Sequence, residues 1–163
     1  MKTKTFLKTG LVVVFVLSVQ FAFAQIIELP TVVITAKSVV NAKVTDAFKG
    51  KFQNAVNPRW YKADKNYLVK FIMDDQKNSA LYDKNASLIY HLSYGAANNL
   101  PKDYLDMVNT AYPGCTVVTA IHVEQNQRSI WFVNVEFKKD YVLTKIENDE
   151  LGEVSRVSNS GAK

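Results

Sequence analysis

The order of predicted elements constrains the fold more than any single motif, because a helix followed by strands occurs twice. The first helix is predicted over about 44–56, with Thr45 as its N-cap and Asn57-Pro58 at its end. Its apolar residues share one face at helical spacing: Ala47, Phe48, Phe52, Ala55 and Val56. A short strand around Trp60, an alternating strand over 67–73 and a hairpin of ALYD and SLIYHLSY complete the first pass.

The second pass begins with the helix LPKDYLDMVNTAYPG, in which Pro101 suits the first turn and Pro113-Gly114 ends the helix. Three strands follow, TVVTAIHVE, WFVNVEF and YVLTKIE, and NDELG then leads into EVSRV. YLVKF matches WFVNVEF, and ALYDKNASLIY matches LTKIENDELGEV. The sequence therefore predicts an internal duplication, with repeat 1 at about 44–94 and repeat 2 at about 101–157. The alternative is a pair of unrelated hairpins.

Short strands joined by tight turns favour antiparallel pairing, and a helix with one apolar face must bury that face against another element. We therefore predict an α+β domain over 44–157. Its two tandem helix-then-antiparallel-strands repeats would form one curved antiparallel sheet with the helices on one face.

The N-terminus reads as a secretory signal peptide over 1–24. Lys2, Lys4 and Lys8 precede the short apolar run LVVVFVLSV, and small alanines stand where a signal peptidase cleaves, near Ala24. We expect a periplasmic or secreted protein with no membrane span after cleavage, because no other apolar run is long enough. Residues 25–43 are expected to form an extended arm or an edge strand, and 158–163 a flexible tail.

The bulk charge excludes one class of partner. The formal net charge of the 163 residues is +5, and it falls to +2 without the three signal-peptide lysines. No Lys/Arg cluster remains, so the sequence does not predict a nucleic-acid partner. Cys115 is the only cysteine, which rules out an internal disulfide and favours a buried, inert thiol.

The same residues resemble the PepSY-like secreted proteins of Bacteroidetes, whose domain is also described as similar to the β-lactamase-inhibitor protein. The matching positions are Phe48, Phe52, Ala55, Trp60, Tyr67, Val69, Phe71, Ala80–Asp83, Leu100, Pro101, Tyr112 and Pro113. One departure lies after Asp83, where the usual Gly is missing, and Asn85 is expected to adopt the positive φ of that turn. The second repeat keeps Gly152.

The resemblance implies a non-enzymatic binding or inhibitory module without a cofactor, whose partner is another periplasmic or cell-surface protein. The alternative is a binder of a small ligand or of a cell-envelope polymer. An enzyme of unrecognised type comes third, because the chain carries no G-x-S-x-G, H-E-x-x-H, phosphate-loop or Cys-His signature.

Two groups of residues resemble metal sites, and neither is predicted to bind a metal. Asp83, Asn85 and Ser87 occupy alternate positions as in a calcium loop, but Leu88 and Tyr94 stand where Gly and Glu are needed. Two histidines and Glu124 could ligate zinc only if the strand register brought them together.

The candidate partner-binding face is the side of the sheet away from the helices. Alternation of Leu88, Tyr90 and Leu92 predicts that His91 points to this side. The pattern Val117, Ile121, Val123 predicts the same for His122. The face is then expected to comprise Lys70, His91, His122, Phe132, Asn134, Glu136 and Lys138, while Trp131, Val133, Val135 and Phe137 pack beneath the helices.

Overall fold

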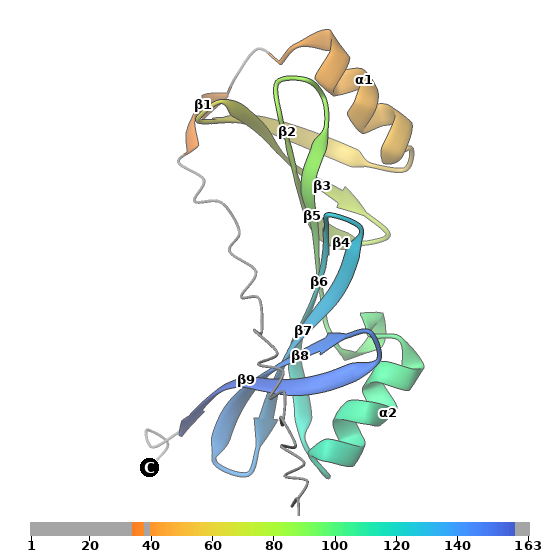
Figure 1. Ribbon diagram of the computed structural model, residues 1–163, viewed down its shortest axis with the longest axis vertical. Coiled ribbons are helices and arrows are strands. Elements are labelled where there is room, and N and C mark those ends of the chain that lie inside the picture. The colour runs from red at the N-terminus through yellow and green to blue at the C-terminus, as the bar shows by residue number, and fades with distance from the viewer. Residues whose placement is uncertain (1–33, 38–39, 159–163) are drawn as a thin grey trace, which may run out of the picture. The chain divides into compact units, whose positions relative to one another are not determined.

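The computed structural model describes residues 34–37 and 40–158. The predicted signal peptide, the first part of the predicted arm and residues 159–163 lie outside them. The elements in chain order are β1 (Ile34–Lys37), α1 (Ala42–Lys51), β2 (Val56–Ala63), β3 (Asn66–Met73), β4 (Gln76–Tyr82), β5 (Leu88–Gly95), a short 3-10 helix η1 (Ala97–Asn99), α2 (Lys102–Ala111), β6 (Thr116–Gln125), β7 (Arg128–Phe137), β8 (Asp140–Glu147) and β9 (Glu150–Ser158) (Figure 1).

All strands belong to one antiparallel sheet in which spatial order equals chain order. Eight strands, β2 to β9, form an open meander, and β1 adds a short strand along β2. Three hairpins close with two-residue loops in which both residues have positive φ: Asp74–Asp75, Asn126–Gln127 and Asn148–Asp149. Such type I′ turns match the twist of the paired strands, and Asn and Asp tolerate this backbone at modest cost.

Helix α1 covers the first four strands of the meander. Its buried residues Val44 and Phe48, with Phe52 just beyond its end, contact Val69 and Phe71 of β3. The phenylalanine rings pack edge-on or tilted, with the Phe48 and Phe71 centroids 5.1 Å apart.

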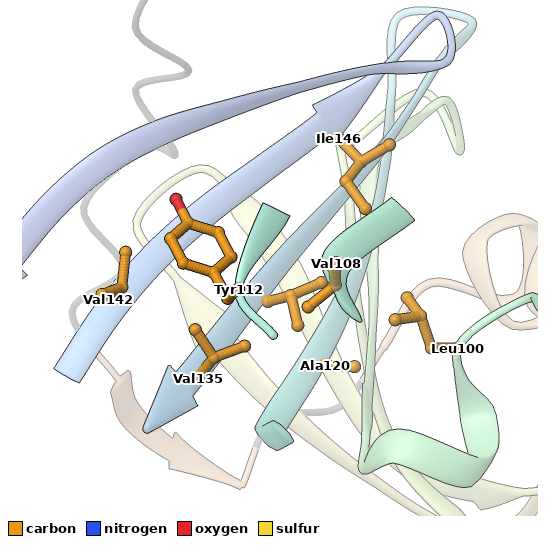
Figure 2. Packing of buried hydrophobic residues seen from close by; sticks show 8 residues of the cluster. Leu100, Val108, Tyr112, Ala120, Val135, Val142 and Ile146 are labelled. Atoms are coloured by element: carbon orange, nitrogen blue, oxygen red, sulfur yellow. The ribbon is translucent and has the colours of Figure 1, made fainter. Parts of the chain in front are cut away.

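Helix α2 covers the last four strands in the same way. Val108 is fully buried, and Figure 2 shows it with Tyr112 among side chains of the sheet. The cluster also contains Leu100, Ala120, Val133, Val135, Val142 and Ile146. Trp131 and Phe137 pack against its border, as the alternation of β7 predicts.

The strand register shows that both helices lie on one side of the sheet, here called the helix side. Directly opposite residues of neighbouring strands share a side, and one such row runs through Phe71, Asn78, Ser93, His122, Trp131 and Ile146. Phe71 lies under α1 and Ile146 under α2. The α+β class and the antiparallel sheet with two helices are thereby confirmed.

Several boundaries differ from the sequence-based expectations. The first helix begins at Ala42, with the Asn41 side chain accepting a hydrogen bond from the Lys43 amide, and it ends at Lys51 rather than near 56. Asn41 replaces Thr45 as the cap because an amide oxygen can accept from the first free N–H groups. The positive φ after Asp83 belongs to Ala86, not Asn85.

Candidate functional site

The opposite side of the sheet, here called the second face, carries a row of cross-strand partners that crosses the whole meander. Its members are Val56, Ile72, Lys77, Tyr94, Ile121, Phe132, Lys145 and Gly152. At its centre Tyr94, Ile121 and Phe132 stand side by side on β5, β6 and β7. Tyr94 is 43% exposed, and the other two are half-buried. We call these three residues the central row.

Next to the central row the second face is apolar and buried. The residues concerned are Leu68, Leu81, Tyr90, Leu92, Val123 and Ile130, each no more than 7% exposed. Over the middle strands both sides of the sheet therefore have little exposed area, and only part of the second face is accessible.

Four of the predicted binding residues do lie on the second face. They are Lys70, Phe132, Asn134 and Glu136. Phe132, Asn134 and Glu136 follow one another along β7, whereas Lys70 lies on β3, four strands away. The structure therefore brings three of them together and separates the fourth.

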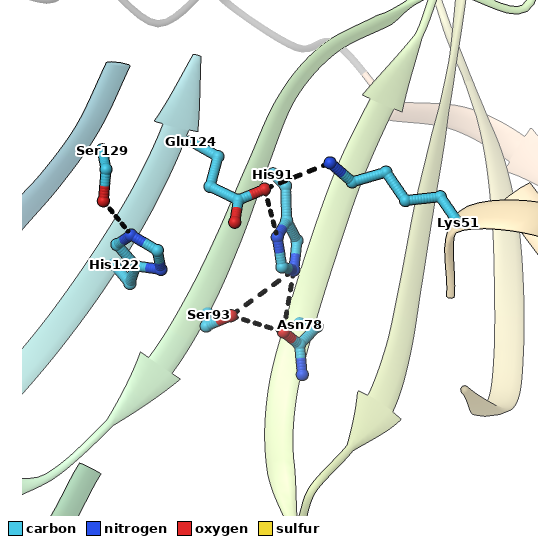
Figure 3. A network of polar contacts seen from close by, with 7 residues as sticks. All are labelled: Lys51, Asn78, His91, Ser93, His122, Glu124 and Ser129. Carbon is cyan, nitrogen blue, oxygen red and sulfur yellow. Dashed lines mark hydrogen bonds and ion pairs between the residues drawn. The ribbon is translucent and has the colours of Figure 1, made fainter. Parts of the chain in front are cut away.

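His91 lies on the helix side, which corrects the predicted placement. Its imidazole is buried, with its centroid 4.7 Å from that of Phe52. His91 Nε2 lies 2.9 Å from Asn78 Oδ1 (Figure 3). The Asn78 amide nitrogen donates to the Met73 and Gln76 carbonyls, so Oδ1 is the acceptor and His91 Nε2 carries the hydrogen.

The other ring nitrogen of His91 faces a carboxylate. Nδ1 lies 3.5 Å from Glu124 Oε2, and the same oxygen accepts a hydrogen bond of 3.3 Å from Lys51 Nζ at the end of α1. Burial lowers the pKa of His91, although Glu124 opposes this effect. Burial, the largest single effect, raises the pKa of Glu124, but Lys51, His91 and His122 together outweigh it and hold that pKa below its usual range.

His122 is also on the helix side and does not contact His91. It lies 2.8 Å through Nε2 from the Ser129 hydroxyl and stacks on Trp131. Burial lowers its pKa. His91 thus packs on the α1 cluster through Phe52, and His122 packs on Trp131 at the border of the α2 cluster. Figure 3 shows the polar side chains around the two histidines.

Two β-bulges explain why the predicted side was wrong for both histidines. One lies on β5 between Leu88, which packs on the α1 cluster, and Tyr90. The other lies on β6 between Val117 and Thr119. Each extra residue reverses the sides of all later residues, so the apolar residues near each strand start do not indicate where the histidine points.

Lys138 does not lie on the second face either, although its side chain is exposed. It lies in the β7–β8 turn with a positive φ, and its ammonium lies 4.9 Å from the ring centroid of Phe137, which packs on the α2 cluster. Since the strand ends at Phe137, alternation does not extend to the next residue.

The residues of both candidate metal sites make other contacts in the structure. Within the described residues, no group of three His, Cys, Asp or Glu side chains is arranged to hold a metal. In the suspected calcium loop, Asp83 Oδ1 accepts the amide hydrogens of Asn85 and Ser87, each at 2.8 Å. This is an Asx-type turn, in which the carboxylate is already used by the backbone.

Sequence reasoning missed Tyr94 and Ile121, the neighbours of Phe132 in the central row. Tyr94 is separated from Lys77 by a hairpin and from Ile121 by a whole helix, so only the register joins them. The signal that could have identified them is a large apolar residue at a strand position whose neighbours two residues away are polar.

No family model matches the chain, and no curated protein matches it. Solved structures do. One is a BLIP-like protein from Bacteroides fragilis, with a TM-score of 0.60 and 18% identity over 77% of this chain and 91% of that one. Another is a DUF2874 family protein from Bacteroides uniformis, with a TM-score of 0.57 and 15% identity over 76% and 94%. A third, from Bacteroides eggerthii and described provisionally as periplasmic, has a TM-score of 0.57 and 12% identity over 77% and 93%.

These likenesses define the class of fold: the chain has a BLIP-like, open antiparallel sheet with two helices. None of the three descriptions names an enzymatic activity or a PepSY domain, so the PepSY-like part of the resemblance stays a prediction. At 12–18% identity these likenesses show the fold alone. In the part of the chain that the structure describes, no helix has the length and apolarity to cross a bilayer.

Proposed function

We propose that the chain is a secreted or periplasmic, non-enzymatic binding module that holds another periplasmic or cell-surface protein against its second face. The central row carries this proposal. Three large apolar side chains on adjacent strands, one of them an exposed tyrosine, are the kind of surface that protein interfaces use as anchors.

The surroundings of the central row support the same reading. Lys77 and Lys145 are the next cross-strand partners at its two ends, and Asn134 and Glu136 continue along β7 from Phe132. An apolar centre with a polar rim is the usual composition of a non-obligate interface. If the partner is a hydrolase, the effect would be steric, because a sheet laid over a cleft excludes substrate.

Two further parts of the proposal concern the internal repeat and the export of the chain from the cytoplasm. Helix α1 followed by β2–β5, and α2 followed by β6–β9, support a tandem repeat of the PepSY-like kind. The basic and apolar segment before Ala24 supports export and cleavage near that residue.

The test is site-specific photocrosslinking in an envelope extract of the source organism. A benzoylphenylalanine replaces Phe132 in one sample and Lys43, on the first turn of α1, in the other. We expect one protein to crosslink at position 132 and not at position 43. Capture by Phe132→Ala should fall about tenfold or more, as for a central hot-spot residue.

Lys49→Ala is the control, because Lys49 is an exposed residue in the last turn of α1, away from the second face. It should leave capture unchanged. Equal crosslinking at both positions, or undiminished capture by Phe132→Ala, would overturn the proposal. A protease-resistant crosslinked product would instead favour the small-ligand or envelope-polymer alternative.

A further inference from the structure

A cleft in the second face of β2 to β5 gathers three cationic side chains. Its volume is about 470 Å³, and Arg59, Lys70 and Lys77 line it together with Tyr61, Ser79 and Tyr94. Tyr94 belongs to both the cleft and the central row, so the two surfaces are continuous.

Among the described residues, none of the three cations has a carboxylate partner of the kind that several other cations have. Arg128 and Lys145 pair with Glu147, and Arg156 pairs with Asp140 and Glu153. Within residues 40–158, no carboxylate lies within ion-pairing distance of Arg59, Lys70 or Lys77. Asp74 and Asp75, in the β3–β4 turn, do not line the cleft.

The strand register makes this arrangement unfavourable for the free protein. Arg59 and Lys70 are directly opposite each other on β2 and β3, and like charges in directly opposite positions destabilise a sheet. An anion held between them would turn the repulsion into two favourable pairs.

The floor of the cleft offers a further unused polar group. Ser79, directly opposite Lys70 on β4, is only 5% exposed, and its hydroxyl forms no hydrogen bond with the described residues. Among the described residues only the Tyr82 hydroxyl is buried without a partner, so the Ser79 hydroxyl is accessible from the cleft. A ligand oxygen bound above Ser79 would provide a partner for its hydroxyl.

We propose that this cleft receives a carboxylate side chain, Asp or Glu, from a protruding segment of the protein partner. The inference rests on the proposed function, because the cleft adjoins the central row through Tyr94. Arg59 and Lys70 would pair with the carboxylate, Ser79 would donate to it, and the tyrosine rings of Tyr61 and Tyr94 would flank the chain that carries it.

The test uses two peptides and inorganic phosphate as probes. N-acetyl-Glu-Glu-amide, its Gln-Gln twin and phosphate are titrated separately into the ¹⁵N-labelled protein, and amide shifts are followed by NMR. We expect the acidic peptide to shift amides of β2 to β5, with an apparent affinity that falls as salt rises. The neutral twin should leave those amides in place.

Three variants test whether the acidic peptide binds in the cleft. Lys70→Gln/Lys77→Gln should weaken binding of the acidic peptide about tenfold or more, and Ser79→Ala should weaken it several-fold. Lys138→Gln/Lys139→Gln removes the same charge at the β7–β8 turn and should leave binding unchanged. Absence of shifts in β2 to β5, equal loss in both double variants, or tighter binding of phosphate than of the peptide would overturn the inference.

The two proposals can fail separately. If Phe132→Ala loses the partner while Lys70→Gln/Lys77→Gln captures it fully, the carboxylate site is wrong and the central row remains the interface. If the acidic peptide binds normally while Phe132→Ala still captures the partner fully, the proposed interface is wrong and the anion site remains.

Discussion

The imidazole of His122 lies flat against the indole of Trp131, with ring centroids 4.6 Å apart and planes 15° from parallel. Trp131 borders the α2 cluster, whereas His91, the other histidine, stacks on Phe71 of the α1 cluster. Each hydrophobic cluster of the helix side thus contacts a histidine; the His91 side chain is buried, and that of His122 is half-buried. This placement makes the stability of the domain sensitive to mild acid.

Stability should fall as pH is lowered from 7.5 to 5.5. Burial lowers the pKa of both His91 and His122 below their ordinary value of 6.5, so the unfolded chain takes up protons that the folded chain does not. Their contribution is therefore complete above pH 6.5 and is lost as pH falls toward the folded-state pKa values. Urea denaturation midpoints at the two pH values measure it, and His91→Gln/His122→Gln should show a smaller difference than the native chain. An equal difference in both would contradict this account.

Tyr82→Phe should stabilise the domain. The Tyr82 hydroxyl is buried against the α1 cluster without a hydrogen-bond partner among the described residues, and burial raises its pKa to about 12. Removing an unsatisfied hydroxyl should raise the free energy of unfolding by about 1 kcal/mol. Tyr112→Phe is the control, because that hydroxyl donates to Glu153 and its loss should be slightly destabilising. Urea denaturation at pH 7.5 distinguishes a gain from a loss.

Acid should also weaken the pairing at the end of the β7–β8 hairpin. The guanidinium of Arg128 binds Glu147 through two hydrogen bonds of 2.7 and 2.9 Å and lowers the pKa of that carboxyl to about 2. Its stabilisation is present above the ordinary pKa of 4.5 and is lost as pH falls toward 2. Glu147→Gln should cost about 1 kcal/mol at pH 6. The difference between the variant and the native chain should shrink by pH 3, and a constant difference would show that the pair contributes nothing.

Gln127→Gly should stabilise the β6–β7 hairpin. Gln127 has a φ of 64° in a two-residue turn after Asn126, and this backbone costs a non-glycine residue about 1–2 kcal/mol. The greater entropy of glycine in the unfolded chain offsets part of the gain, leaving about 0.5–1 kcal/mol. Lys139→Gly, at a turn position without positive φ, should destabilise instead. The melting temperatures of the two variants, compared with that of the native chain, show whether each substitution stabilises or destabilises the protein.

The elements of this fold were predictable because most of them have one buried side. The alternation of β3 predicted that Val69 and Phe71 face a helix, and both are buried beneath α1. The end of α1 was not predictable from spacing, because Phe52 packs with Phe48 equally well when it lies just beyond the last turn.

The candidate site was less accessible to sequence reasoning because it depends on register. His91 lies between Tyr90 and Leu92, and all three residues are buried, so hydrophobic alternation could not distinguish the two sides of β5. Similarly, Arg59 and Lys70 stand eleven positions apart in the sequence, and only the β2–β3 pairing makes them neighbours. Electrostatic and interface properties of a sheet follow from such pairings, which composition does not encode.

Because strand order equals chain order, nearly every pairing can form before distant parts of the chain meet. Within the β2–β9 meander the β5–β6 pairing is different, since residues 96–115 with α2 separate its strands. Closing a loop of that length costs about 2 kcal/mol more in chain entropy than closing a two-residue turn. We therefore expect β5–β6 docking to be the slow step of folding, and the seam between the two halves to be where hydrogen exchange first opens the native sheet.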